Sequence, residues 1–348
     1  MKGRVIVLDR IDGRPAAALM VDGRLEDFVL DPPRGSPPVP GTIFRGVCDR
    51  PMKGQGGMIL RLPDCRGFLR GGNGLRTGAS VLVQVTRVGE AGKAVPVSGR
   101  ILFRSRYAII TPGAPGLNIA RSIRDAAERD RLRALVRGAM SDAPERFGAI
   151  MRSAAEGVDG DVLVRDIART RDLAIAVLAN GAGEPECLVE GPTAHKIAWR
   201  DWATPAPDDV RQGVGSFADA GVLEAVDALR SARVPLCGGA HAMIEPTAAL
   251  VAVDVNTGAG TSPSAGVKAN LALARDLPRQ LRLRGLGGQI TLDLAPMPKK
   301  DRRGFEDALR RALRVDGTDT VLAGWTPLGH FELQRKRDRF PLKELWFE

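Results

Sequence analysis

Two short apolar segments in the last third of the chain each carry one acidic residue near their C-terminal end. Asp254 lies in the segment V-A-V-D-V-N, and Asp293 lies in the segment Q-I-T-L-D-L. A carboxylate is costly to bury unless it is paired or coordinates a metal ion. Because side chains alternate between the two faces of a strand, Asp254 shares a face with Asn256, and Asp293 shares a face with Thr291. If the strands are neighbours, the carboxylates and the amide converge on an all-oxygen site that suits Mg2+ or Mn2+.

A plainer interpretation of these aspartates stays open. A single aspartate at the end of a strand more often forms a turn or caps a helix than holds a metal ion. The second strand of the same kind, and the asparagine two residues after Asp254, bring the two interpretations close to balance.

Zinc chemistry has little support in this sequence. The cysteines and histidines are dispersed, and no C-x-x-C pair occurs among them, so we expect neither a structural zinc site nor a zinc hydrolase or Ser-His-Asp site. These residues are Cys48, Cys65, Cys187 and Cys237, and His195, His241 and His330.

The charge balance favours a polyanionic partner. Among 348 residues, 51 are Lys or Arg and 41 are Asp or Glu, which gives a formal net charge of +10. Nucleic acid is the first candidate and an anionic membrane surface the second, although a basic solvated surface would give the same numbers. No apolar run reaches the roughly 18 residues that span a bilayer. The run Val5–Leu8 is too short for the core of a signal peptide, so we expect a cytoplasmic protein.

The elements that must position the two aspartates alternate between helix and strand, which predicts an α/β layer. We expect Pro278 to kink the helix between the two aspartate strands, and Asp301 and Gly317 to begin and end the next helix. The buried face of that second helix is expected to carry Phe305, Leu309, Ala312 and Leu313. The expected helices and strands of this region are a helix at 222–232, the two aspartate strands, the two helices just described, and strands at 321–325 and 330–333.

The first hundred residues show the alternation and turn signals of β structure. Asp12-Gly13 and Asp22-Gly23 are hairpin turns between strands expected at 5–8, 16–21 and 28–30. After a proline-rich linker, short strands are expected at 42–47, 57–62, 67–69 and 81–88. This pattern suits a five-stranded OB barrel, a fold that binds single-stranded nucleic acid through stacking aromatics and a basic groove. Phe68 is the candidate for stacking on bases, and packing of its ring in the barrel core is an equally good interpretation.

Between the barrel and the α/β layer we expect helices at 118–140 and 164–180, a strand at 148–152 and loops over 190–215.

Three segments of the chain resemble the RNase E/G ribonucleases. They are V-D-V-N-T-G at 253–258, R-Q-L-R-L-R-G-L-G-G-Q-I-T-L-D-L at 279–294 and T-P-L-G-H-F-E-L-Q-R-K-R at 326–337. The resemblance implies an α/β multi-domain fold, in which an S1-type OB barrel is inserted in a split RNase H-like unit, followed by an α/β 5′-sensor and a DNase I-like catalytic subdomain. The implied boundaries are 1–38 and 191–229 for the RNase H-like parts, 39–100 for the OB domain, 101–190 for the 5′-sensor and 230–348 for the catalytic subdomain.

The resemblance also implies an activity. It is a Mg2+-dependent endoribonuclease, with Mn2+ as a substitute ion, that cleaves single-stranded RNA in rRNA processing or mRNA decay. Asp254 and Asp293 would hold the metal, and Asn256 would orient an aspartate or the scissile phosphate. A metal-activated water would attack phosphorus and leave a 5′-phosphate on the downstream product. The alternative is a non-catalytic RNA-binding protein that retains the scaffold.

Two further groups of RNA contacts are implied only by the resemblance. Arg152 and Ser153 stand where the family has an Arg-Thr pair that grips a 5′-monophosphate, and Ile109 would be their apolar neighbour. In the OB domain, Phe68 matches a stacking aromatic, Met58 takes the place of a second one, and Lys93 matches a basic RNA contact.

Some family features have no counterpart in this sequence. Pro296 stands where the family often has another aspartate, and Pro327 replaces an arginine that some members use near the sensor. The C-P-x-C zinc link and the small domain beyond it are not found. We therefore expect a monomer or dimer rather than a zinc-linked tetramer.

Overall fold

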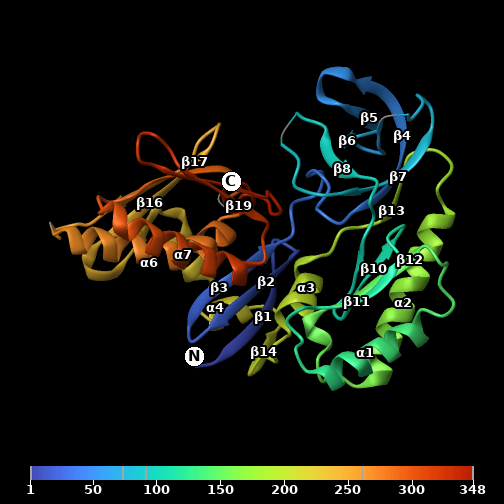
Figure 1. Cartoon of the computed structure of the whole chain (residues 1–348), viewed down its shortest axis with the longest axis horizontal. Helices are drawn as coiled ribbons and strands as arrows, with labels where there is room; N and C mark the ends of the chain where they lie inside the picture. The colour runs from blue at the N-terminus through green and yellow to red at the C-terminus, as the bar shows by residue number, and fades with distance from the viewer. Residues whose placement is uncertain (1, 73, 91, 261, 347–348) are drawn as a thin grey trace. The chain divides into compact units, whose positions relative to one another are not determined.

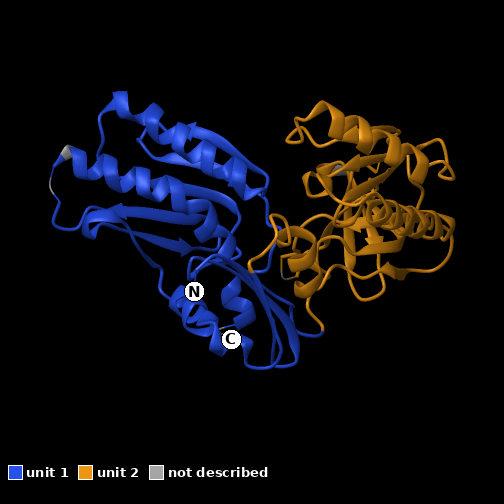
Figure 2. Cartoon of the chain, turned by 90° about the horizontal axis from the view of Figure 1, so that it is seen from below, with its two compact units in different colours: residues 1–34, 209–348 blue, residues 35–208 orange. Residues whose placement is uncertain are grey.

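A computed structural model describes residues 2–72, 74–90, 92–260 and 262–346. The chain divides into two compact units (Figure 2). Unit 1 comprises residues 1–34 and 209–348, and unit 2 comprises residues 35–208.

Unit 1 contains a six-stranded sheet with the order β15-β16-β17-β18-β20-β19 (Figure 1). The central pair, β17 and β18, is parallel, and the other neighbours are antiparallel. The strands are β15 (Arg233–Pro235), β16 (His241–Pro246), β17 (Val251–Asn256), β18 (Gly288–Asp293), β19 (Thr320–Trp325) and β20 (Phe331–Arg335).

Two helices cover one face of this sheet. α6 (Pro263–Leu283) connects β17 to β18, and α7 (Lys299–Asp316) connects β18 to β19 (Figure 1). The apolar residues that alternate along the central strands pack against these helices; they include Val251, Val253, Val255, Ile290 and Leu292, with Leu273, Leu277, Phe305 and Leu309 from the helices. The other face of the two central strands carries their exposed polar residues. The expected α/β layer is therefore confirmed, with one covered and one open face.

The helix ends differ in part from the expectation. α6 continues through Pro278 to Leu283 as one helix. Asp301 does not cap α7, because the helix begins at Lys299 and places Asp301 in its first turn. A carboxylate in that turn still interacts favourably with the helix dipole. Gly317, with φ of 77°, ends α7 as expected, since glycine adopts the left-handed conformation without strain.

A smaller sheet in unit 1 joins the two stretches of sequence that make up this unit. Its order is β14-β1-β2-β3, and β14 (Asp209–Gln212) runs parallel to β1 (Arg4–Ile11). Both expected hairpin turns are present, with positive φ at Asp12, Gly13, Asp22 and Gly23. β2 is Arg14–Val21 and β3 is Arg24–Leu30; the short helices that contribute to this core are α4 (Ser216–Asp219), α5 (Val222–Asp227) and α8 (Leu342–Trp346). The helix expected at 222–232 is therefore shorter and ends in a 3-10 turn, Ala228–Arg230.

A buried ion network ties the small sheet to the large one within unit 1. Arg282 of α6 lies 2.7 Å from Glu26 and 3.4 Å from Asp27 on β3, and it also contacts Asp316 at the end of α7. Asp316 lies 2.7 Å from Arg335 of β20, and both side chains are 1% exposed. Buried charges are tolerated only when they are paired in this way.

Unit 2 contains a closed barrel of five strands, consistent with an OB fold. Its strands follow the order β4-β5-β6-β8-β7, and pairing of β7 with β4 closes it. The strands are β4 (Ile43–Met52), β5 (Gly57–Arg61), β6 (Arg66–Arg70), β7 (Ser80–Val85) and β8 (Val95–Ser98), with β13 (Glu186–Val189) added outside β4.

The rest of unit 2 is a four-stranded sheet with two helices. The strand order is β11-β12-β10-β9, from β9 (Phe103–Arg104), β10 (Ala108–Pro112), β11 (Gly116–Ile119) and β12 (Phe147–Met151). The expected helix at 118–140 is wrong at its start, because residues 116–119 pair with β12 as a strand. α1 (Ala126–Ala139) begins only after Asp125, which accepts a hydrogen bond from the Glu128 amide.

The later part of unit 2 follows the expectation more closely. α2 (Gly160–Ala179) covers the helix expected at 164–180 and is capped by Asp159. The region expected as loop contains the short helix α3 (Ala194–Ile197) and a π-helical turn, Ala198–Trp202.

Candidate active site

Asp254 and Asp293 lie directly opposite each other on the central parallel pair. The register pairs Val251 with Ile290 and brings Asp254 beside Asp293. Both aspartates are exposed on the open face of the sheet, and the Asp293 side chain is 67% exposed. The strands are neighbours because their intervening apolar residues pack on the same helices. The expected convergence of the two carboxylates is thus present in the fold.

Asn256 completes this group by contacting the first carboxylate. Its Nδ2 donates a hydrogen bond of 2.6 Å to Oδ2 of Asp254. The two residues share a strand face, so their spacing of two positions brings the side chains together. Asn256 therefore fixes the orientation of Asp254 and leaves the second carboxylate oxygen free of this contact.

His330 also lies at the site, although it was not predicted to do so. Its Nδ1 is 3.4 Å from Oδ1 of Asp293. His330 immediately precedes β20, and the pairing of β20 with β18 brings the imidazole to the carboxylate of Asp293. The only sequence signal was its position inside the third segment that resembles the RNase E/G proteins.

The donor set fits Mg2+ better than a closed transition-metal site. Within residues 2–72, 74–90, 92–260 and 262–346, no three His, Cys, Asp or Glu side chains gather as a protein-only ligand set. Mg2+ commonly binds one or two carboxylates and keeps several waters for contacts with substrate phosphates. The exposed pair Asp254 and Asp293 offers that arrangement.

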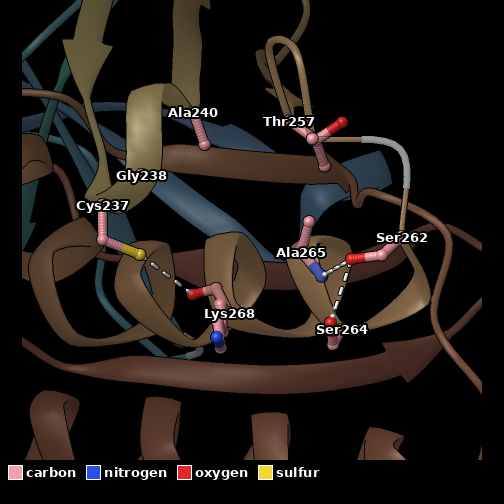
Figure 3. Close-up of a pocket in the computed structure, with 9 residues that line it drawn as sticks. Cys237, Gly238, Ala240, Thr257, Ser262, Ser264, Ala265 and Lys268 are labelled. Carbon is pink, nitrogen blue, oxygen red and sulfur yellow. Dashed lines mark hydrogen bonds between the residues drawn. The ribbon is translucent and has the colours of Figure 1, made fainter.

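A cavity of about 380 Å³ lies where β17 passes into α6 (Figure 3). Its wall includes Thr257, which directly follows the Asn256 of the site, and the first turns of the helix at Ser262, Ser264 and Lys268. Ser262 caps α6 by accepting a hydrogen bond from the Ala265 amide. Ligand sites in α/β sheets commonly lie beyond the carboxyl ends of parallel strands, which is where this cavity is found.

A buried asparagine, which was not predicted as a site residue, fixes the segment that follows Asp293. Asn270 of α6 is 0% exposed. Its Nδ2 donates to the Ala295 carbonyl at 2.8 Å, and its Oδ1 accepts from the Ala295 amide at 3.1 Å. Pro296, which stands where the family often has another aspartate, is the next residue. Asn270 therefore sets the course of the chain as it leaves the site.

The predicted RNA contacts of the barrel differ in their exposure. Phe68 is partly buried on β6 and covers Gly57, where a Cβ would come within 2.5 Å of its ring. Lys93 is exposed and lies 2.5 Å from Glu90. Met58 is 3% exposed in the barrel core, so a direct contact between Met58 and RNA does not fit this structure.

The predicted sensor residues lie in the four-stranded sheet of unit 2. Arg152 follows β12, Ser153 is exposed beside it, and Ile109 is partly buried on the neighbouring β10. The Arg152 guanidinium is already engaged by protein groups. Nη2 donates to Asp201 at 2.8 Å, and Nη1 donates to the carbonyls of Ser105, Arg106 and Arg200.

Three arginines converge on the carboxylate of Asp201. Arg152, Arg104 and Arg200 lie 2.8, 3.2 and 2.8 Å from its oxygens. Burial alone would raise the pKa of Asp201, but hydrogen bonds and charges from the three arginines outweigh it and hold that pKa below its ordinary value. Burial lowers the pKa of Arg104 to about 10. A terminal phosphate would have to compete with Asp201 for these guanidinium groups.

Comparison with known proteins decides the family. The profile of the ribonuclease E/G family matches residues 103–212 and 208–338, which is more than half of the chain. The chain belongs to the ribonuclease E/G family. The matched residues include Asp254, Asn256, Asp293 and His330, so the candidate site lies inside the region that carries the family likeness.

Individual relatives give the same family. The chain is 30% identical over 305 residues to Ribonuclease E of a Synechocystis strain and 29% identical over 305 residues to Ribonuclease E of a Nostoc strain. It is 28% identical over 302 residues to Ribonuclease G of Salmonella typhimurium. Each match covers 76% of this chain but only 44–61% of the relative, so the chain spans about half the length of these proteins.

Within the part of the chain that the structure describes, no helix is both long enough and apolar enough to span a bilayer.

Proposed function

We propose that this chain is a metal-dependent endoribonuclease that cleaves single-stranded RNA in rRNA processing or mRNA decay. The observation that carries the proposal is the parallel register that brings Asp254 beside Asp293 on an open sheet face. The relatives named Ribonuclease E and Ribonuclease G support RNA as the substrate. The net charge of +10 suits a polyanionic substrate.

The site residues have distinct tasks in this proposal. Asp254 and Asp293 would hold Mg2+, or Mn2+ in its place, through the carboxylate oxygens that face solvent. When bound there, the cation would neutralise charge on the scissile phosphate and lower the pKa of an attacking water. Asn256 holds Asp254 in one rotamer, so the carboxylate need not reorganise when substrate arrives. The covered face of the sheet keeps the two strands in register.

The remaining RNA contacts and the finer architecture are part of the same proposal. The barrel would be an S1-type domain that binds RNA through Phe68 and Lys93. Arg152, Ser153 and Ile109 would form the 5′-phosphate site once Arg152 exchanged Asp201 for phosphate. The small sheet would be the RNase H-like unit, and the six-stranded sheet with α6 and α7 the DNase I-like catalytic subdomain. We further propose that the protein works in the cytoplasm as a monomer or dimer.

Removal of either carboxylate should abolish cleavage. The substrate is a labelled AU-rich oligonucleotide with a 5′-monophosphate or a 5′-hydroxyl, incubated with Mg2+ or with EDTA. We expect the Asp254→Asn and Asp293→Asn variants to cut it more than about 100-fold more slowly, since loss of a supporting residue alone costs 10–100-fold. Asp319→Asn, at an exposed aspartate that immediately precedes β19, is the matched control and should cut at the unaltered rate.

Two outcomes would oppose this function. Cleavage that persists unchanged in both aspartate variants would show that the metal site is elsewhere. RNA that is shifted in a gel by the unaltered protein but never cut, with Mg2+ or Mn2+, would favour the non-catalytic RNA-binding scaffold.

A further inference from the structure

We propose that His330 is a positioning residue that orients Asp293 for metal binding. The inference rests on the proposed function, because it concerns how the second carboxylate of that site is held. His330 would act through Asp293 rather than bind the cation itself, since the described residues contain no three-ligand group.

The contact between the two side chains has the chemistry of a donor facing an acceptor. His330 Nδ1 is 3.4 Å from Asp293 Oδ1. This nitrogen is closed off from solvent and has no hydrogen-bond partner among the described residues. A buried polar atom without a partner destabilises the folded state. A neutral imidazole carries its proton on one nitrogen, and placing it on Nδ1 gives Asp293 a donor. A small rotation of the exposed carboxylate would bring the pair to hydrogen-bond distance.

The imidazole is the fixed partner in this pair, because the backbone on both sides of it is held. The Thr326 amide donates to the His330 carbonyl at 2.8 Å, and the His330 amide donates to Thr326 Oγ1 at 3.1 Å. The next residue, Phe331, is 1% exposed and packs against the rings of Phe305 and Trp325. Asp293, by contrast, has a side chain that is 67% exposed.

The two carboxylates of the site are then held in the same way. Asn256 Nδ2 contacts one oxygen of Asp254, and His330 Nδ1 faces one oxygen of Asp293. In each pair a nitrogen atom faces one carboxylate oxygen and leaves the other for the cation. Hydrogen-bonded ligands of this kind bind metals more tightly, because their orientation is set before the ion arrives.

Direct measurement of Mn2+ binding tests this role without any reliance on cleavage. Isothermal titration of the full chain with Mn2+ would compare His330→Leu, which removes the donor, with His330→Asn, whose amide nitrogen can take the place of Nδ1. We expect the leucine variant to bind Mn2+ roughly 10- to 100-fold more weakly. The asparagine variant should recover most of the affinity. Gln334→Leu, at an exposed position of β20, the strand that follows His330, is the matched control and should bind as the unaltered protein does.

The outcomes separate this inference from the proposed function. If Asp254→Asn and Asp293→Asn weaken Mn2+ binding but His330→Leu does not, the role of His330 is wrong and the site stands. An asparagine variant as weak as the leucine variant would also overturn the role of a donor. If the unaltered protein and Asp254→Asn bind Mn2+ equally, the metal site itself fails. Should the leucine variant unfold early in a thermal melt, His330→Ala replaces it, with the same expected loss.

Discussion

At the residue scale, each candidate metal ligand has a nitrogen-bearing neighbour: Asn256 donates to Asp254, and His330 lies beside Asp293. The polar residues Asp254, Asn256 and Asp293 were predicted, because they stand out within apolar alternating strands. His330 was not predicted, because the pairing of β18 with β20 that brings it to Asp293 joins segments far apart in the chain. Asn270 looked like an ordinary polar helix residue until its side chain was seen on both backbone groups of Ala295.

The cluster around Asp201 should make the stability of unit 2 depend on acid pH. The folded-state pKa of Asp201 is depressed, so its contribution is present above the ordinary aspartate pKa of about 3.9 and is lost as pH falls through the folded value. We expect Asp201→Asn to be less stable than the unaltered protein at pH 7. The difference should shrink steadily below about pH 4. Urea denaturation between pH 7 and pH 2 would measure it, with the exposed Glu145→Gln as control. An equal difference at both extremes would contradict the prediction.

At the element scale, strands with strict alternation were predicted well, and long-range pairing was not. The two hairpins at Asp12-Gly13 and Asp22-Gly23 followed from local turn chemistry. The start of the helix expected at 118–140 was wrong, because its charged, helix-like sequence hid the end of a strand, residues 116–119, that only pairing with β12 reveals. Asp301 was wrong as a cap because Pro298 already precedes the first turn of α7. The five-stranded barrel was predicted and is confirmed, although the pairing of β4 with β7 that closes it joins strands that are not consecutive in the sequence.

The ion pair between α7 and β20 should be needed for stability mainly because it is buried. Asp316 and Arg335 are each 1% exposed and lie 2.7 Å apart. Asp316→Leu alone should lower the free energy of unfolding by about 3–5 kcal/mol, because it leaves Arg335 without a counter-charge. The double variant Asp316→Leu with Arg335→Met should recover part of that loss. Guanidinium denaturation would show it, and a double variant less stable than Asp316→Leu would contradict this explanation.

At the scale of the whole molecule, the excess of positive charge predicted a polyanionic partner before any fold was known. The net charge alone did not indicate which surface binds the polyanion, because several basic residues form ion pairs within the protein. Arg282, Arg335 and Arg339 bind buried acids in unit 1, and Arg152 binds Asp201 in unit 2. Only the structure separates these from exposed cations such as Lys93.

Phe68 and Lys93 should therefore affect RNA binding in different ways. Phe68→Ala should weaken binding of a single-stranded oligonucleotide by about 1–3 kcal/mol without changing its salt dependence, since stacking is uncharged. Lys93→Gln should reduce the slope of log Kobs against log salt by about 0.7, the value for one phosphate contact on a single strand. Fluorescence anisotropy from low to high salt would measure both. Equal slopes in the unaltered protein and Lys93→Gln would exclude Lys93 as a phosphate contact.

The unit that bears the two aspartates is assembled from both ends of the sequence, with residues 35–208 inserted between its parts. A ribosome releases Asp27 long before it has made Arg282 and Arg339, the side chains that neutralise it. The first strands are therefore synthesised before the arginines that pair with Asp27, and residues 35–208 are translated in between. The pair Asp254 and Asp293 therefore reaches its folded arrangement only after nearly the whole chain has been made.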